Sequence, residues 1–230
     1  MELLLKVIFL AHIFAGGITL ISGPIAIFYN FKQPRNHKLA GKIFFYAMFF
    51  VCASAVIGFL KQPDQIFYQF LLGIAVLVWA GIMRGIRSVM LMKGGKITNF
   101  DWVYTSILGF AGLAMVGWAG WLLSMNVNIA FPILFTVFGA GALKDTVKNY
   151  RIFSNWENMS KFQWMELHLV SMLGAFIAST TAFTVNAAPF LPWPAQWFGP
   201  TVMLVPVVYF FVKKVKSLSG NIEKTAPSTI

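Results

Sequence analysis

Two histidines, His12 and His168, lie within long apolar segments, where ionisable side chains are rare. An ionisable side chain inside a bilayer is costly, so its presence there indicates a function by default. Imidazole can bind a metal ion or a haem iron, or it can take up and release a proton near neutral pH. The alternative is a neutral histidine that only hydrogen-bonds to a neighbouring helix of a membrane bundle.

The depths of the two histidines decide whether they could share one haem. At about 1.5 Å per residue, we expect His12 roughly 13 Å below one boundary and His168 roughly 9 Å above the other, across a core about 30 Å thick. The remaining separation of roughly 8 Å strains a haem that has both histidines as axial ligands. A haem held by His168 and Met172, one helical turn further on, is the alternative.

A second set of candidate ligands is predicted at the cytoplasmic ends of the spans. His37 lies in the loop after the first apolar segment, Asp101 and Asp145 lie at span ends, and His168 approaches the same side. Imidazole and carboxylate ligands together suit zinc or iron, so these four residues are the predicted metal site. The simpler readings are a headgroup contact for His37 and a helix-capping acid for Asp101. Asp145 is harder to explain, because the helix dipole opposes a negative charge at the end of a helix.

The elements that must position these residues are transmembrane helices. Hydrophobic residues make up 58% of the chain and charged residues only 11%. A soluble domain needs roughly a quarter charged residues, so this composition excludes a water-soluble fold. Seven apolar runs reach or approach the roughly 20 residues that cross a hydrocarbon core. They cover residues 3–29, 43–60, 66–83, 103–123, 129–143, 164–185 and 198–212.

The distribution of basic residues predicts the topology. All but two of the 18 basic residues, Lys6 and Lys61, follow the odd-numbered spans. Because basic segments stay in the cytoplasm, this pattern predicts an external N-terminus, a cytoplasmic C-terminus and an odd number of spans. The first apolar run lacks the basic n-region and the cleavage site of a signal peptide, so we retain it as a helix. The fold class is therefore all-α, with a seven-helix transmembrane bundle over residues 1–216 and a polar, disordered tail over residues 217–230.

The net charge of +11 is accounted for by this basic rim and does not require nucleic acid as a partner. We expect the lipid bilayer to be the partner, with anionic headgroups attracted by about 1 kcal/mol per basic residue near the surface. The single cysteine, Cys52, permits no internal disulfide.

Several short segments, distributed along nearly the whole chain, carry a resemblance to a known family. They include the span that begins at His12 and ends with Gly23-Pro24, the loop 36–46, and the segments 94–101, 142–145, 168–172 and 180–186. In these residues the chain resembles a family of bacterial membrane proteins catalogued as domain of unknown function 2306 (DUF2306). The resemblance implies the same span count and a bacterial inner-membrane location, and it supplies no activity. Many members carry a His-Arg-x-Trp-Met motif where this chain has Asn99-Phe100-Asp101-Trp102, so a histidine role at that place is absent here.

The leading hypothesis is a multi-pass inner-membrane protein with a histidine-centred buried site. Its cofactor-binding residues are His12 and His168, and the site binds a metal or haem or relays protons. One alternative is a transporter or channel for a small solute, which would use the same helix faces as a pathway. Another is an accessory or scaffold protein that binds lipid or a membrane partner. No catalytic residue is assigned, and retinal attachment is excluded because no lysine lies within the seventh apolar run.

Overall fold

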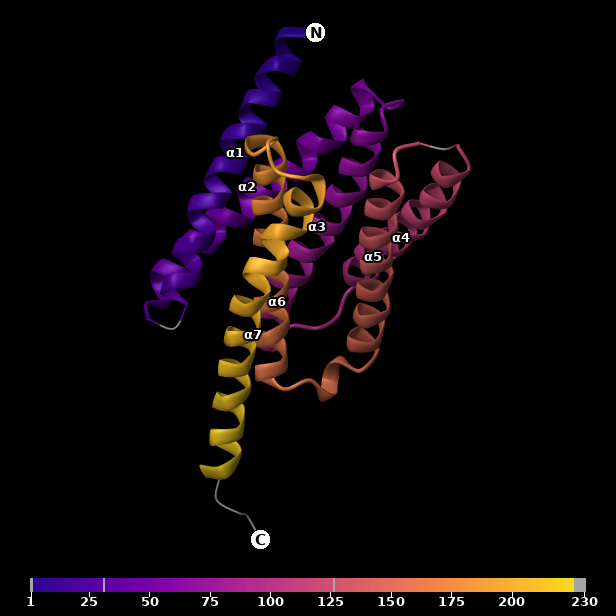
Figure 1. Cartoon of the computed structure of the whole chain (residues 1–230). Coiled ribbons are helices and arrows are strands. Elements are labelled where there is room, and N and C mark those ends of the chain that lie inside the picture. Colours follow the sequence, from indigo (N-terminus) through magenta and orange to yellow (C-terminus); the bar gives the residue numbers. More distant parts are fainter. Residues whose placement is uncertain (1, 31, 126, 226–230) are drawn as a thin grey trace.

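The computed structural model describes residues 2–30, 32–125 and 127–225, which form seven long α-helices (Figure 1). All seven helices are long and apolar enough to cross a membrane. The prediction of an all-α seven-helix transmembrane bundle is therefore confirmed, and the chain is a multi-pass membrane protein. The helices are α1 (Glu2–Tyr29), α2 (Pro34–Lys61), α3 (Ile66–Met92), α4 (Asn99–Ser124), α5 (Ala130–Ser154), α6 (Lys161–Ala187) and α7 (Trp193–Thr225), and a 3-10 turn, η1 (Trp156–Asn158), precedes α6.

Local sequence signals set several of the helix ends. At the start of α4, the backbone N–H of Thr98 donates to Asp101 Oδ2 at 2.8 Å and completes a capping box. Ser160 and Gln163 form the same arrangement at the start of α6. α3 ends where Gly94 adopts a φ of 93°, a left-handed conformation that glycine reaches without a steric penalty. These caps satisfy backbone groups that a helix end leaves without partners.

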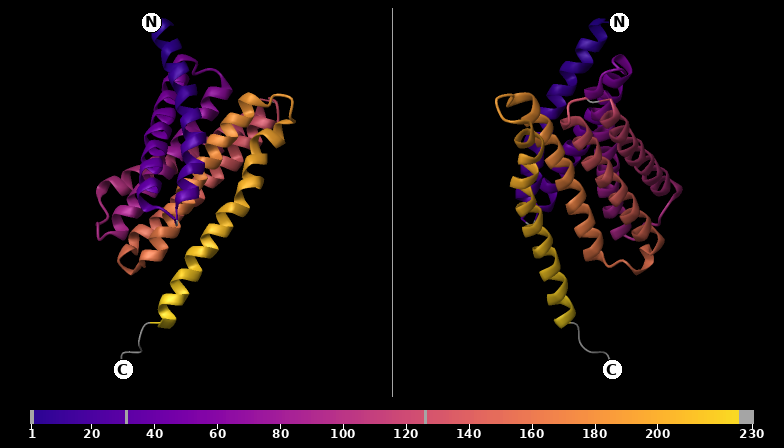
Figure 2. Two further views of the ribbon diagram at one scale, coloured as in Figure 1. Left: turned by 90° about the vertical axis from the view of Figure 1, so that its left-hand side faces the viewer. Right: turned by 45° about the vertical axis from the view of Figure 1, so that its right-hand side comes forward.

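The helix α3 lies in the middle of the bundle and packs against α2, α4, α5 and α6. The helices α1 and α2 form one pair, and α4 and α5 form another on the far side of α3 (Figure 2). The helix α6 packs chiefly on α3 and α7, whereas α5 packs chiefly on α4. Because α5 and α6 have little direct packing, side chains of α3 provide the main connection between them.

The helices α4 and α5 approach closely at Gly112 and Gly139. A Cβ atom on Gly112 would lie 3.1 Å from the carbonyl oxygen of Gly139, and a Cβ atom on Gly139 would lie 3.1 Å from the carbonyl oxygen of Gly112. Small residues allow helix backbones to pack this closely inside a membrane bundle.

Several helices extend beyond the apolar runs that predicted them, and in three of them the extension changes where a residue of interest lies. α3 continues to Met92, so Arg84 lies inside a helix and not in the loop that follows. α5 continues to Ser154, so the prediction that Asp145 ends a helix is wrong. α2 begins at Pro34, which places His37 in its first turn and corrects its assignment to a loop. Polar side chains are tolerated in these segments because several of them form hydrogen bonds or ion pairs with residues of other helices.

The C-terminal helix also differs from expectation. α7 runs to Thr225 and covers much of the tail predicted for residues 217–230. Residues 226–230 of that tail lie outside the described residues.

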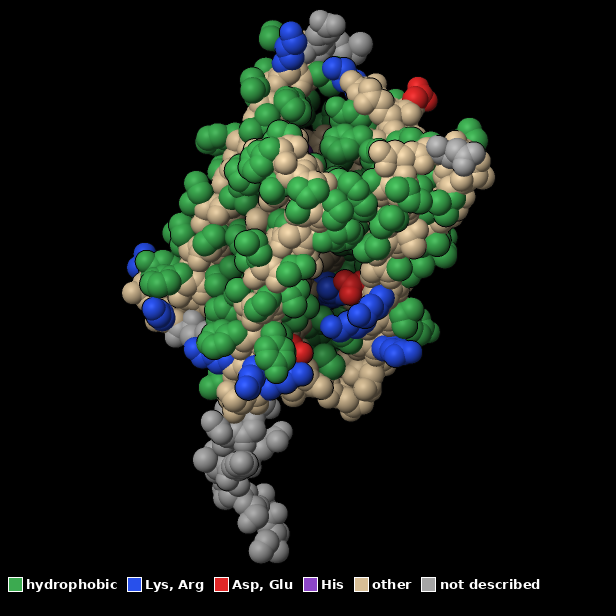
Figure 3. Space-filling model, in the orientation of Figure 1, with side chains coloured by type: hydrophobic (Ala, Val, Ile, Leu, Met, Phe, Trp, Pro, Cys, Tyr) green, Lys and Arg blue, Asp and Glu red, His purple; other side chains and the backbone are tan. Residues whose placement is uncertain are grey.

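Charged side chains are distributed unequally between the two ends of the bundle. Figure 3 shows hydrophobic side chains over the middle of the visible face, with most basic side chains toward the lower part of the view. The lower end is where the segments 30–33, 93–98 and 155–160 connect the helices. We call it the basic end. The hydrophobic middle suits contact with lipid, as the composition predicts.

Candidate functional site

Arg84 of α3 is a buried cation in the middle of the bundle, with only 5% of the residue exposed. Its Nε donates to Ser171 Oγ of α6 at 2.8 Å. Its Nη1 donates to Asn149 Oδ1 at 3.1 Å, and its Nη2 donates to Asp145 Oδ2 at 3.0 Å, both in α5. The guanidinium group therefore joins α3 to α5 and to α6, two helices that have little other direct packing.

These contacts explain why a charge is tolerated at this position. A buried charge is strongly unfavourable unless it is paired and hydrogen-bonded, and Arg84 has both an anionic partner and neutral acceptors. Asn149, which is 1% exposed, extends the network because its amide donates to Thr105 Oγ1 of α4 at 3.4 Å. The network thus includes side chains from four helices.

Asp145 is the outward-facing member of this network. Its side chain is 37% exposed, whereas the side chain of Arg84 is 6% exposed. Only Oδ2 accepts a hydrogen bond from a described residue, so Oδ1 has none. In Figure 3, acidic and basic side chains lie in a hollow between the hydrophobic surfaces of α5 and of α6 and α7. The carboxylate therefore connects the buried arginine with the outside of the bundle.

His37 of α2 and His168 of α6 form a histidine pair, with ring centroids 6.3 Å apart and ring planes at 78°. The Nδ1 of His168 donates to the carbonyl oxygen of Gly85 at 2.8 Å, and the Nδ1 of His37 donates to that of Ala26 at 3.0 Å. A carbonyl oxygen can only accept, so each Nδ1 carries a hydrogen. In a neutral imidazole, Nε2 then keeps its lone pair. Each histidine therefore retains one nitrogen that can accept a proton or bind a metal ion.

The histidine pair and the Arg84 network are neighbours. Gly85, which His168 contacts, follows Arg84 in α3, and Ser171, which Arg84 contacts, lies one turn after His168 in α6. We call the six residues His37, Arg84, Asp145, Asn149, His168 and Ser171 the polar layer. It crosses the bundle from α2 to α5 at one level.

His12 lies outside the polar layer. Its Nδ1 lies 2.7 Å from Ser54 Oγ of α2, and the Ser54 hydroxyl donates to backbone carbonyl oxygens of its own helix, so Ser54 accepts from His12. This contact is the hydrogen bond to a neighbouring helix that the alternative interpretation of the buried histidines expected.

The structure separates His12 from His168. Thr19 of α1 is hydrogen-bonded to Ser179 of the antiparallel helix α6. At about 1.5 Å per residue, His12 lies roughly 10 Å from this contact toward one end and His168 roughly 16 Å toward the other. The separation along the bundle is therefore much larger than the sequence predicts, because α1 and α6 have 28 and 27 residues and are longer than the core of about 30 Å from which the depths were predicted. The two histidines do not face one shared cofactor.

Met172, the alternative haem ligand, is part of the apolar core. Its side chain packs against Gly85, where an added Cβ atom would lie 2.6 Å from Met172 Cε. It also packs against the core cluster formed by α2, α3 and α6.

The two acids of the predicted metal site have arginine partners. Arg87 donates to both carboxylate oxygens of Asp101, at 2.7 and 2.6 Å, and Asp101 also accepts from the backbone of Thr98. The reading of Asp101 as a capping acid is therefore confirmed. Asp145 is paired with Arg84.

The four predicted metal ligands are consequently not brought together. Within the described part of the chain, no group of three or more His, Cys, Asp or Glu side chains is placed to hold a metal ion. Of the four, the structure places His37 beside His168, while Asp101 and Asp145 are neutralised by Arg87 and Arg84.

Sequence reasoning missed Arg84, Asn149 and Ser171. One signal was present: no glycine pair or proline interrupts the chain between Arg84 and Gly94, so the helix could be extended through the arginine. Asp145 and Asn149 are also four residues apart, a spacing that places an acid and an amide on one helix face.

Tyr104 of α4 is a further polar residue that sequence reasoning missed. It is 0% exposed, and its hydroxyl is the one buried side-chain polar atom in the described residues without a hydrogen-bond partner. Its ring packs against Trp79, Phe100 and Phe153. An unpartnered hydroxyl in a core is uncommon.

Comparison of the chain with protein-family models, with curated proteins and with solved structures gives no match. The polar layer is the part of the molecule from which a function can be inferred.

Proposed function

We propose that the polar layer relays protons in a bacterial inner-membrane protein whose basic end faces the cytoplasm. The observation that carries the proposal is the position of the histidine pair beside a buried arginine that holds a half-exposed carboxylate. Ionisable side chains at membrane depth are typical of proton pathways in pumps and transporters. The orientation is supported by the concentration of basic residues at one end of the bundle.

The histidine pair supplies two proton acceptors in fixed orientations. Because each Nδ1 donates to a backbone carbonyl, each Nε2 is the nitrogen that gains or loses the proton. Histidine changes charge near neutral pH, which suits a group that must be protonated and deprotonated in turn. A water molecule or a small ring movement would bridge the 6.3 Å between the ring centroids.

Asp145 exchanges protons between the polar layer and its surroundings. When its carboxylate is ionised, it neutralises Arg84, and when it is protonated, that ion pair is weakened. Arg84 then keeps its hydrogen bonds to Ser171 and Asn149. The protonation state of one carboxylate is thereby coupled to the contact that joins α5 to α3 and α6.

The test is proton movement into vesicles that contain the purified protein and a pH-sensitive dye, driven by a potassium diffusion potential. We expect the wild-type protein to acidify the vesicle interior faster than protein-free vesicles do. Asp145→Asn and His168→Gln should each slow this movement by about tenfold or more, a loss typical of a positioned proton-transfer group.

Two matched substitutions lie outside the polar layer and serve as controls. Asp64→Asn changes an exposed acid between α2 and α3, and His12→Gln changes the histidine bonded to Ser54. Both should leave the rate near that of the wild-type protein. A wild-type rate equal to that of empty vesicles contradicts the proposal.

A second candidate function is metal or haem binding at the histidine pair. One observation favours it: a histidine that binds a metal through one nitrogen commonly donates its other N–H to a backbone carbonyl, as His37 and His168 do. Elemental analysis and an absorption spectrum of the protein in mild detergent test this function. A stoichiometric metal or a Soret band that is lost in His37→Ala and His168→Ala, and retained in His12→Ala, would support it.

Membership of the DUF2306 family, which the sequence motifs suggest, is itself part of this proposal; it would imply the inner-membrane location and would leave the activity open. We also propose that anionic lipid headgroups gather at the basic end, because exposed lysines there face the headgroup region. A solute transporter or channel would use the same polar layer, and the proton-flux assay detects it when transport is coupled to protons.

A further inference from the structure

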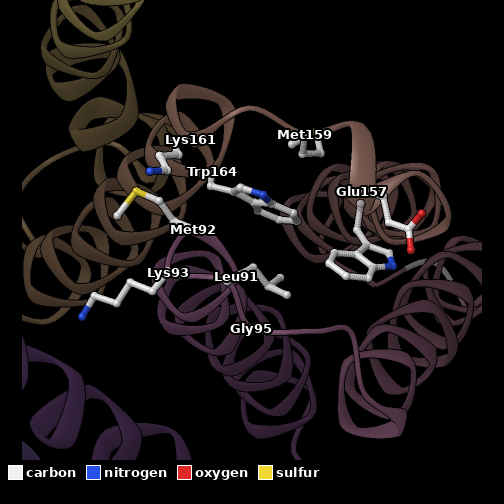
Figure 4. A pocket seen from close by; sticks show the side chains of 10 residues that line it. Leu91, Met92, Lys93, Gly95, Glu157, Met159, Lys161 and Trp164 are labelled. Atoms are coloured by element: carbon white, nitrogen blue, oxygen red, sulfur yellow. The ribbon is translucent and has the colours of Figure 1, made fainter.

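A pocket of about 410 Å³ lies at the basic end, between the end of α3 and the start of α6 (Figure 4). Its walls include Leu91 and Met92 of α3, Trp156 of η1, and Met159 and Trp164 near the start of α6. None of the six residues of the polar layer lines it. Its volume is within the range of roughly 300–1,000 Å³ that is usual for ligand pockets.

Five of the ten residues that line this pocket have apolar or aromatic side chains, and these side chains are well supported. Leu91 and Trp164 are 5% and 3% exposed and belong to one core cluster, against which Met92, Trp156 and Met159 pack. A pocket with two indole rings and two methionines can surround an apolar group, because thioether and aromatic side chains adapt to its shape.

The polar groups that reach the pocket include several hydrogen-bond donors. The indole N–H of Trp164 makes no hydrogen bond with a described residue, and it is not among the buried polar atoms without a partner, so it is accessible from the pocket at which Figure 4 shows its ring. Lys93 and Lys161 line the rim, and neither forms an ion pair with a described residue. An acceptor atom of a ligand in the pocket would therefore be able to accept a hydrogen bond from the Trp164 N–H.

The charges at the rim are separated. In Figure 4, Lys93 and Lys161 extend on the side of Met92, whereas the carboxylate of Glu157 lies on the opposite side of the pocket. A ligand can therefore place an anionic group on the side of the lysines without approaching the carboxylate.

We propose that this pocket binds an anionic amphiphile, with its apolar part between the indole rings and its carboxylate or phosphate near Lys93 and Lys161. The Trp164 N–H donates to an oxygen of the same anionic group. The ligand comes either from the adjacent lipid leaflet or from the aqueous side of the basic end. An organic cation, which would use the tryptophan rings and Glu157, is the opposite outcome of the same test.

The experiment uses the full-length protein in dodecyl maltoside and follows tryptophan fluorescence during titration with octyl phosphate. Octyltrimethylammonium and octanol, with the same chain length, report the contributions of a positive charge and of the chain alone. We expect a saturable change with octyl phosphate, and binding at least about tenfold weaker for the other two compounds. Equal or tighter binding of octyltrimethylammonium would overturn the proposal.

Variants locate the binding. Trp164→Phe and Trp156→Phe should each remove part of the fluorescence change. Trp121→Phe, near the end of α4 and outside the pocket, should leave the fluorescence change intact. Lys93→Gln combined with Lys161→Gln should weaken octyl phosphate binding by about tenfold, as expected for two exposed charge contacts. The matched pair Lys144→Gln and Lys148→Gln in α5 should not weaken it. Unchanged affinity in the first lysine pair would overturn the proposal.

A second arm identifies the source of the ligand. The titration is repeated in nanodiscs of phosphatidylcholine with and without phosphatidylglycerol. Weaker octyl phosphate binding in the presence of phosphatidylglycerol would assign the pocket to a leaflet lipid, and unchanged binding would assign it to a soluble amphiphile. Both results require binding at the pocket, and neither depends on proton relay by the polar layer.

Discussion

The guanidinium group of Arg84 lies 3.0 Å from the carboxylate of Asp145, although the two residues are 61 positions apart in sequence. The arginine is buried and the carboxylate is half-exposed, so the pair joins the middle of the bundle to its surface. The histidine pair His37 and His168 lies beside it. Together these contacts place four ionisable side chains in one layer of a membrane-spanning bundle.

Arg84→Met should destabilise the protein, because it leaves Asp145, Asn149 and Ser171 without their shared donor. Breaking a buried pair from one side costs about 3–5 kcal/mol, and the exposure of Asp145 favours the lower value. Thermal unfolding in detergent measures the loss. The double variant Arg84→Met/Asp145→Leu should recover part of it, and a double variant less stable than the sum of the two single losses would contradict this account.

Thr98→Ala should lower the stability of the start of α4 by about 1 kcal/mol, because it removes the N-cap side chain. Asp101→Ala should cost more, since it also leaves Arg87 without its carboxylate partner. Hydrogen exchange of the first turns of α4 reports both effects. Equal protection in the two variants would show that the Arg87 contact contributes little.

Gly139→Ala should destabilise the contact between α4 and α5, because the added Cβ atom would meet the backbone oxygen of Gly112. We expect a loss of about 1–3 kcal/mol, as for other overpacked interfaces. Gly141→Ala in the same helix is the matched control, since no atom lies within 4 Å of its added Cβ. Thermal unfolding of the two variants should therefore differ, and an equal midpoint would contradict the close approach.

The orientation can be measured with single cysteines in a Cys52→Ser background. Asp64→Cys lies between α2 and α3, and Ser217→Cys lies near the end of α7. With the basic end in the cytoplasm, a membrane-impermeant maleimide should label position 64 in intact cells and position 217 only after permeabilisation. The reverse pattern would invert the topology.

The seven helices were predictable because hydrophobic composition and the alternation of basic residues are properties of the whole sequence. The capping role of Asp101 was also predictable, since it depends on residues next to it. The continuation of α3 past Arg84 and of α5 past Asp145 was not predictable. An arginine can remain in the bundle only when partners from other helices compensate its charge. Those partners are distant in sequence.

The site could be predicted only in part for the same reason. The predicted metal site placed His37 and His168 at the same end of the spans, and the structure has their rings side by side. The same prediction included Asp101, which pairs with Arg87, and the cofactor hypothesis also named His12, which lies apart from both histidines. Which histidines meet depends on how α1 and α2 pack against α6, and helical periodicity within one segment carries no information about that packing.

The most direct test of the proton relay compares Asp145→Asn, His168→Gln and the double variant in the vesicle assay. If the two residues belong to one relay, the double variant should be no slower than the slower single variant, because one interruption already stops the pathway. If they act independently, the two reductions in rate should multiply. Non-additive loss is the result we predict, and wild-type rates in both single variants would contradict the proposed function of the polar layer.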